Sequence, residues 1–152
     1  MTSHASLALI SIALLLAAPR PAGSVVGLRA AVVQGLEANH RLTVRVLWLD
    51  RVPAGTGTAT AGPALAQLRQ SAAARLRAGI RVRLLTDHFQ VSGVKIGGAF
   101  ASAVLVDRER VRPYSLAGRP LGAAVSLHEA ALAILHRLPG TKHFVVWELR
   151  PR

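Results

Sequence analysis

The chain of 152 residues contains no cysteine. Neither a disulfide bond nor a lipid attached to cysteine at a cleavage point is therefore possible, and the fold must be held by packing alone. The length suits one domain with a modest core and is too short for two.

Aromatic and acidic side chains are also scarce. Six aromatic residues make up 4% of the chain, and 7 acidic residues face 19 basic ones, which gives a formal net charge of +12. A charge of this size favours polyanions, and outside a cell these are anionic wall polymers, lipid headgroups or stray nucleic acid. Nucleic acid is disfavoured because no aromatic residues interleave the basic ones as a base-stacking platform. The spread of arginine through every segment is equally typical of a solvated surface.

One long apolar run is present, "LALISIALLLAA" at Leu7–Ala18, and a breaker-rich "PRPAGS" follows it. The run is short for a membrane span but fits the apolar region of a secretory signal. We therefore expect residues 1–24 to be a secretory signal segment and residues 25–152 to form a single exported domain, secreted or in the cell envelope. Since Arg20 is the only charged side chain removed, the net charge would fall from +12 to +11. An uncleaved membrane anchor is the alternative, because no Lys or Arg precedes the run.

Helical periodicity dominates the first half of the remaining chain. Apolar residues three and four positions apart predict a helix that begins near Val25, and residues 42–52 are assigned to a second helical stretch, with a strand as the alternative. The Gly, Thr and Pro content of Pro53–Pro63 indicates a surface connection. A further helix is predicted over residues 64–78, with Gly79 as its stop.

The period changes to two at Ile80, where apolar residues alternate with Arg81 and Arg83. Gly97 and Gly98 separate two alternating runs and predict a hairpin in which both glycines take positive φ. A second hairpin is predicted around "PGTK" at Pro139–Lys142, before the β-branched and aromatic run "HFVVWEL". The expected fold class is α+β, with N-terminal helices packed on a curved antiparallel sheet of about four strands.

The pattern over residues 64–149 resembles a known domain type. Gly79 ends a helix before a strand, Gly97 marks a tight turn, and Tyr114 and Trp147 stand near the ends of later strands. This order is similar to the cystatin-like or nuclear-transport-factor-like companion domain that precedes the catalytic part of exported bacterial amidase-domain proteins. The resemblance implies the fold and at most an accessory or binding role. No catalytic residue carries over, because the amidase part is absent.

The segment "LHEAALAILH" at Leu127–His136 opens like the zinc-protease motif H-E-x-x-H. Position 132, however, is Leu, and His136 lies eight residues after His128, about 12 Å away along a helix axis. Two imidazoles at that distance cannot share one zinc ion, and along a strand they would lie about 26 Å apart. Because a four-residue link to "HFVVWEL" suits a hairpin, we interpret the segment as the penultimate strand and predict no metal site.

Two functional hypotheses follow. The first is an exported non-enzymatic accessory or binding domain that contacts an anionic envelope polymer or lipid surface, with an exported hydrolase as a further possible partner. The second is a small pocket enzyme of the cone-shaped type that uses a single Asp or His as acid or base. The candidate ligand-binding residues are Arg81, Arg83, Asp87 and His88; no catalytic residue and no cofactor is predicted. We interpret the charged stretch Asp107–Arg112 as a strand edge.

Overall fold

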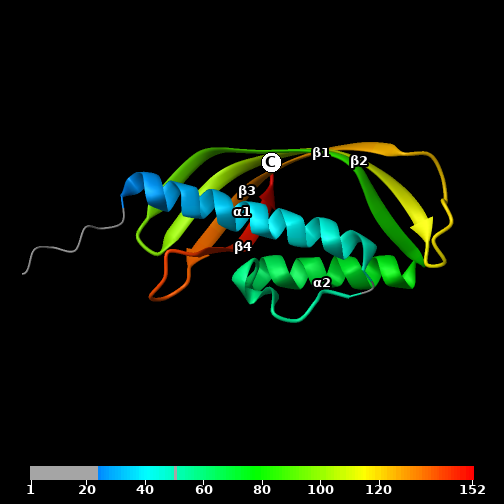
Figure 1. Ribbon diagram of the computed structural model, residues 1–152, viewed down its shortest axis with the longest axis horizontal. Coiled ribbons are helices and arrows are strands. Elements are labelled where there is room, and N and C mark those ends of the chain that lie inside the picture. The colour runs from blue at the N-terminus through cyan, green and yellow to red at the C-terminus, as the bar shows by residue number, and fades with distance from the viewer. Residues whose placement is uncertain (1–23, 50) are drawn as a thin grey trace, which may run out of the picture.

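The computed structural model describes residues 24–49 and 51–152. The predicted signal segment, except Ser24, lies outside these residues. Two helices precede four strands, so the expected α+β fold class is confirmed (Figure 1). The elements are the helices α1 (Val25–Trp48) and α2 (Gly62–Arg77), the short 3-10 turn η1 (Thr56–Thr58), and the strands β1 (Ile80–Gly97), β2 (Phe100–Ser115), β3 (Val125–Arg137) and β4 (Phe144–Pro151).

Helix α1 is one continuous helix of 24 residues. Ser24 caps it, because its Oγ accepts a hydrogen bond of 3.2 Å from the backbone N–H of Gly27. The helix continues to Trp48, so residues 42–48 of the predicted second helical stretch are the end of α1 and not a separate helix. Residues 49, 51 and 52 of that stretch are not helical, so this part of the prediction is wrong. Within the described part of the chain, neither helix is both long and apolar enough to cross a membrane.

Helix α2 ends where the sequence predicts. Gly79 follows its C-cap with a φ of 69°, the left-handed conformation that commonly closes a helix. The two helices are joined by Arg75, whose guanidinium donates 2.9 Å to the carbonyl oxygen of Val46 near the end of α1. This bond uses a carbonyl that the helix end leaves without an internal partner.

The sheet is an antiparallel meander in the order β1-β2-β3-β4. The first turn consists of Gly98 and Ala99, and only Gly98 has a positive φ, of 62°. The predicted turn at Gly97–Gly98 is therefore displaced by one residue. The segment Leu127–His136 lies entirely within β3, the penultimate strand, so the helix that a zinc-protease motif requires does not form.

Both helices lie against one face of the curved sheet (Figure 1). The core between them contains small residues at its centre, Ala101 and Ala103 on β2 and Ala133 on β3, each at most 4% exposed. The larger buried side chains surround them and come from every layer: Val32, Leu36, Leu105, Leu135, Phe144 and Val146.

The outer edge of β4 is paired with the segment before α2. Thr60 forms a parallel bridge with Val146, with backbone bonds of 2.9 Å from Ala61 N–H to the Val146 oxygen and 3.1 Å from Val146 N–H to the Ala59 oxygen. The Thr60 hydroxyl also donates to the Val146 oxygen, at 3.3 Å. The predicted surface connection Pro53–Pro63 thus contains a segment that is paired with the sheet, and this pairing satisfies backbone groups that an edge strand would otherwise expose.

Candidate functional site

A polar cluster lies between α1 and the sheet. It consists of His40 on α1, Asp87 on β1, and Asp107 and Glu109 on β2. The Nε2 atom of His40 lies 2.7 Å from Oδ2 of Asp87, and its Nδ1 atom lies 3.3 Å from Oδ2 of Asp107. Each ring nitrogen thus faces a carboxylate oxygen, so both can donate when the imidazole is protonated.

Strand register explains why the three carboxylates meet. Asp87 is paired with Glu109, and Phe89 with Asp107. Paired residues and alternate residues share one face of a sheet, so all four side chains project on the helix side. Phe89 stacks on the His40 ring with centroids 4.3 Å apart and an angle of 14°, which fixes the imidazole between the acids.

Burial and neighbouring negative charge raise the pKa of two acids of this cluster. The pKa of Glu109 is raised from 4.5 to about 7, first by burial and then by the Asp107 carboxylate. Burial also raises the pKa of Asp107, with the Asp87 carboxylate acting in the same direction and the His40 charge opposing it. Oδ1 of Asp107 is buried and has no hydrogen-bond partner. The cluster therefore holds a proton near neutral pH that isolated carboxylates would release.

The same cluster offers one imidazole nitrogen and three carboxylate oxygens within 4.8 Å of one another. This ligand set is compatible with a divalent cation that accepts oxygen and imidazole ligands. A cation would have to compete with the His40 ring for the oxygens of Asp87 and Asp107. The simplest role of the cluster is structural: His40 of α1 contacts Asp87 of β1 and Asp107 of β2, and these contacts hold the helix on the sheet.

Part of the other face of the sheet is basic. Register places His88 opposite Arg108, and Arg108 opposite His128, so one row of basic side chains crosses three strands. Arg108, Arg110 and Arg112 are alternate residues of β2 and therefore lie on the same side of the sheet. Arg83 on β1 is paired with Arg112. We call the exposed members of this group, Arg83, His88, Arg108, Arg110 and His128, the basic patch.

The charges are separated by face. Asp87, Asp107, Glu109 and Glu129 are four of the 7 acidic residues of the chain, and register places them together on the helix side. In the described lengths of β1, β2 and β3, no acidic residue alternates onto the side of the basic patch. The interpretation of Asp107–Arg112 as a strand edge is wrong, because β2 lies between β1 and β3 and its charges are sorted between two faces.

The four predicted ligand-binding residues do not form one site. Arg83 and His88 belong to the basic patch, whereas Asp87 lies on the opposite face with His40, as expected for neighbours on a strand. Arg81 is half-buried, and its guanidinium lies 5.7 Å from the centroid of the Trp48 ring. Its observed role is to pack on the end of α1 through a cation–π contact.

The sequence analysis did not single out His40. A signal was present, because His40 lies four residues after Leu36 and eight after Val32, both of which are buried. A histidine on the apolar stripe of a helix must meet a polar partner in the opposite layer. The alternating acids of β1 and β2 are that partner.

Comparison with known proteins adds information on the fold. No protein-family model matches the chain, and no curated protein matches it significantly. Among solved structures, the intermembrane space region of the chloroplast protein ARC6 superposes with a TM-score of 0.65 at 13% identity, over 80% of this chain and 94% of that one. This likeness shows a shared fold alone.

Proposed function

We propose that the chain is an exported, non-enzymatic accessory domain that binds an anionic envelope polymer through the basic patch. The observation that supports this most is the sorting of charge by strand register: the basic side chains are exposed together on the sheet face opposite the helices, while the nearby acids face the helices. Neighbouring strands are about 4.8 Å apart, so the row His88–Arg108–His128 spans about 10 Å. A polymer with closely spaced negative charges could contact the whole row.

Removal of two patch arginines tests this proposal. The variant Arg83→Ala/Arg108→Ala should bind poly(glycerol phosphate) about tenfold more weakly than the parent at low ionic strength, since each exposed ionic contact contributes up to about 1 kcal/mol. Binding by the parent should also fall steeply with added salt. Both effects can be measured by sedimentation or isothermal titration calorimetry.

The matched control removes the same charge from the helical side. Arg41 and Arg45 are exposed on α1, and Arg41→Ala/Arg45→Ala should bind nearly as the parent does. Equal losses in the two double variants would mean that net charge alone determines binding, which would contradict a defined patch. Equal affinity for neutral dextran would contradict the electrostatic mechanism.

The polar cluster favours a second candidate, a small enzyme that uses one side chain as acid or base. The sequence suggested a single Asp or His for this role, whereas the cluster, which holds Asp87 beside His40, makes Glu109 the better candidate. A carboxyl with a pKa of about 7 can donate or accept a proton at neutral pH. Hydrolysis of p-nitrophenyl acetate between pH 5 and 9 provides a simple test. A rate above background that disappears in Glu109→Gln and persists in the patch variant would support this enzyme over the binding domain.

A further inference from the structure

One end of the molecule brings together the start of α1, the β1–β2 turn and the β3–β4 turn (Figure 1). The start of α1 and the end of β1 line a common cleft of about 330 Å³, which is bordered by Val25, Leu28, Arg29, Val94, Ile96 and Gly98. The backbone N–H of Arg137, the last residue of β3, donates at 2.8 Å to the oxygen of Ala99 in the β1–β2 turn. These contacts place the three segments side by side. We call this region, residues 25–29, 94–100 and 137–142, the hairpin end.

Large apolar side chains are exposed at the hairpin end. Val25 and Val26 are each 78% exposed in the first turn of α1, and Phe100, the first residue of β2, is 54% exposed. Among the large apolar side chains of the described residues, these three are the most exposed. The cleft beside them is lined by apolar residues and glycine, with Arg29 as the one charged residue of its lining. An exposed apolar group of this kind marks a surface that meets another molecule or a membrane.

The same end carries positive charge and no acid. No acidic residue occurs at positions 1–36, 88–106 or 130–147, which include the three segments and the chain that precedes them. The only two lysines of the chain, Lys95 and Lys142, are both exposed here, together with Arg29. Lys95 is paired with Ser102, so it lies on the same face of the sheet as Phe100. The hairpin end therefore combines apolar and cationic side chains, which suits an anionic surface.

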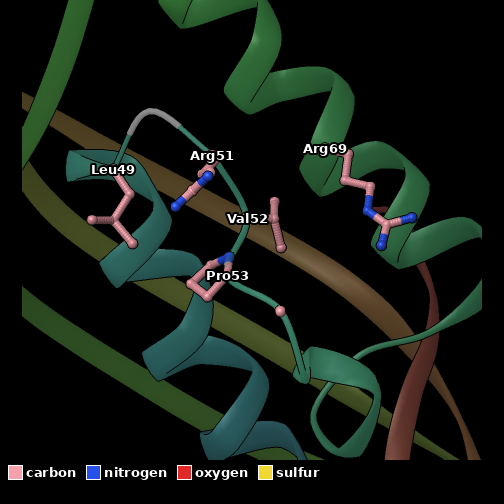
Figure 2. Close-up of a pocket in the computed structure, with 6 residues that line it drawn as sticks. Leu49, Arg51, Val52, Pro53 and Arg69 are labelled. Carbon is pink, nitrogen blue, oxygen red and sulfur yellow. The ribbon is translucent and has the colours of Figure 1, made fainter.

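The other end of α1 has a different character. There the chain continues from Leu49 through Asp50 to Val52, and Figure 2 shows Leu49 and Val52 around the same pocket as Arg69 of α2. A helix rises about 1.5 Å per residue, so the 24-residue α1 places its last residue about 35 Å from Val25. The acid that follows α1 in the sequence is therefore too far away to neutralise the hairpin end.

The chain before α1 carries an apolar segment that is tethered to this end. The run Leu7–Ala18 ends six residues before Ser24, and six residues span at most about 20 Å. A bilayer that takes up this run, as a signal or as an anchor, therefore lies within about 20 Å of the first turn of α1. The hairpin end is the part of the described domain that such a bilayer meets first.

We infer that the hairpin end docks on the surface of an anionic lipid bilayer, with its apolar side chains among the headgroups and its two lysines near the lipid phosphates. Apolar burial in the interface and attraction of basic side chains to anionic lipid act together in peripheral membrane binding. The hairpin end is separate from the basic patch, so this inference goes beyond the proposed polymer binding and does not depend on it.

A fluorescent label tests the inference in the full chain, because the chain contains no cysteine and one introduced thiol is labelled alone. Ala99→Cys places an environment-sensitive fluorophore in the β1–β2 turn, and Ala117→Cys places it in the exposed turn after β2, at the opposite end of that strand. With vesicles of equal parts phosphatidylcholine and phosphatidylglycerol, the emission should shift to the blue at position 99 and not at position 117. The shift should be lost on phosphatidylcholine alone, where the lysines have no anionic partner.

Two charge variants on the Ala99→Cys background test the lysines. Lys95→Ala/Lys142→Ala should require about 25-fold more vesicles for the same shift, since each lysine near an anionic surface contributes about fivefold. Arg41→Ala/Arg45→Ala removes the same charge from exposed positions later in α1 and should leave the shift unchanged. The patch variant Arg83→Ala/Arg108→Ala should also keep the shift, so failure of the polymer proposal would not affect this one.

Two apolar variants on the same background test the exposed side chains. Val26→Ser/Phe100→Ser should abolish the shift, because serine contributes no apolar surface to the interface. The matched control is Leu121→Ser/Val125→Ser, which removes side chains that are 53% and 51% exposed at the other end of the sheet. This control should respond as the parent does.

Three results would overturn the inference. Equal shifts at positions 99 and 117 would mean that no particular end faces the bilayer. A full shift when the lysine and apolar substitutions are combined would mean that the run Leu7–Ala18 alone holds the label at the membrane. A blue shift that appears without vesicles and grows with protein concentration would show that a second copy of the chain, and not lipid, covers the hairpin end.

Discussion

Replacement of Gly35 by alanine should destabilise the domain by roughly 2–4 kcal/mol, although alanine is the better helix former. Gly35 is a buried residue of α1, and a Cβ atom added there would collide with the carbonyl oxygen of Phe144, the first residue of β4. That oxygen is backbone, so the collision is relieved only if the helix and the strand separate. The separation would open the core around Phe144, which is 1% exposed.

Urea denaturation of the variant and the parent measures this effect. Gly27→Ala, in the first turn of the same helix, is the matched control because a Cβ there meets only the Ser24 hydroxyl, at 3.4 Å. The control should gain up to about 1 kcal/mol from helix propensity. If Gly35→Ala were as stable as Gly27→Ala, the close contact between α1 and β4 would be absent.

Glu109→Gln should make the stability of the domain less dependent on pH and raise it at pH 8. A folded-state pKa of about 7 against 4.5 means that the native state binds this proton more tightly than the unfolded state does. The stabilisation is fully present below pH 4.5 and is lost as the pH rises through 7. At full strength the shift corresponds to about 3.4 kcal/mol. Because the side chain is partly exposed and screened by water, we expect about 1.5 kcal/mol.

The measurement is the free energy of unfolding of both proteins at pH 5, 6, 7 and 8. Glutamine cannot ionise beside Asp87 and Asp107, so the advantage of the variant should grow along this series. His40 from α1 and Glu129 from β3 are the other titratable groups near these acids, and both remain in the variant. A constant difference between the two proteins would mean that Glu109 titrates normally.

Glu148→Gln is the control for this series. Glu148 lies on β4, and its pKa is lowered by hydrogen bonds from Arg150, at 2.9 and 3.0 Å. Its ion pair contributes above the unfolded-state pKa, so its loss should slightly destabilise the protein at pH 8, the opposite sign to Glu109→Gln. A stabilising effect in both variants would indicate relief of general charge and not a local cluster.

The elements with strong local signals could be predicted from the sequence. The alternation that begins at Ile80 and the closure of α2 by Gly79 depend on neighbouring residues, and both are found as expected. The Ala and Leu content of Leu127–His136 favours a helix, so composition alone does not predict this strand. The short link to a β-branched run predicts a hairpin instead, and the segment is a strand in the structure. The first turn, at Gly98 and Ala99, lies one residue later than the predicted turn at Gly97 and Gly98. Of the two glycines only Gly98 has a positive φ, and Gly97 is the last residue of β1.

The polar cluster could not be predicted in the same way. The cluster joins residues 40, 87, 107 and 109, and their meeting depends on how α1 crosses the sheet and on the β1–β2 register. Two bulges, between Leu84 and Thr86 and between Ser92 and Lys95, change that register. The second contains Gly93, which has a φ of 58° and is a residue type typical of bulges, whereas the sequence does not indicate the first.

The pairing of Thr60 with Val146 makes the two borders of the sheet unequal. One border is closed where the chain itself occupies the hydrogen-bonding groups of β4, whereas β1 forms the other border over 18 residues. The two bulges of β1 interrupt the regular spacing that a further strand would need, and its charged side chains oppose stacking of identical copies. Self-association by strand addition is therefore hindered at both borders, by occupancy at β4 and by irregularity and charge at β1.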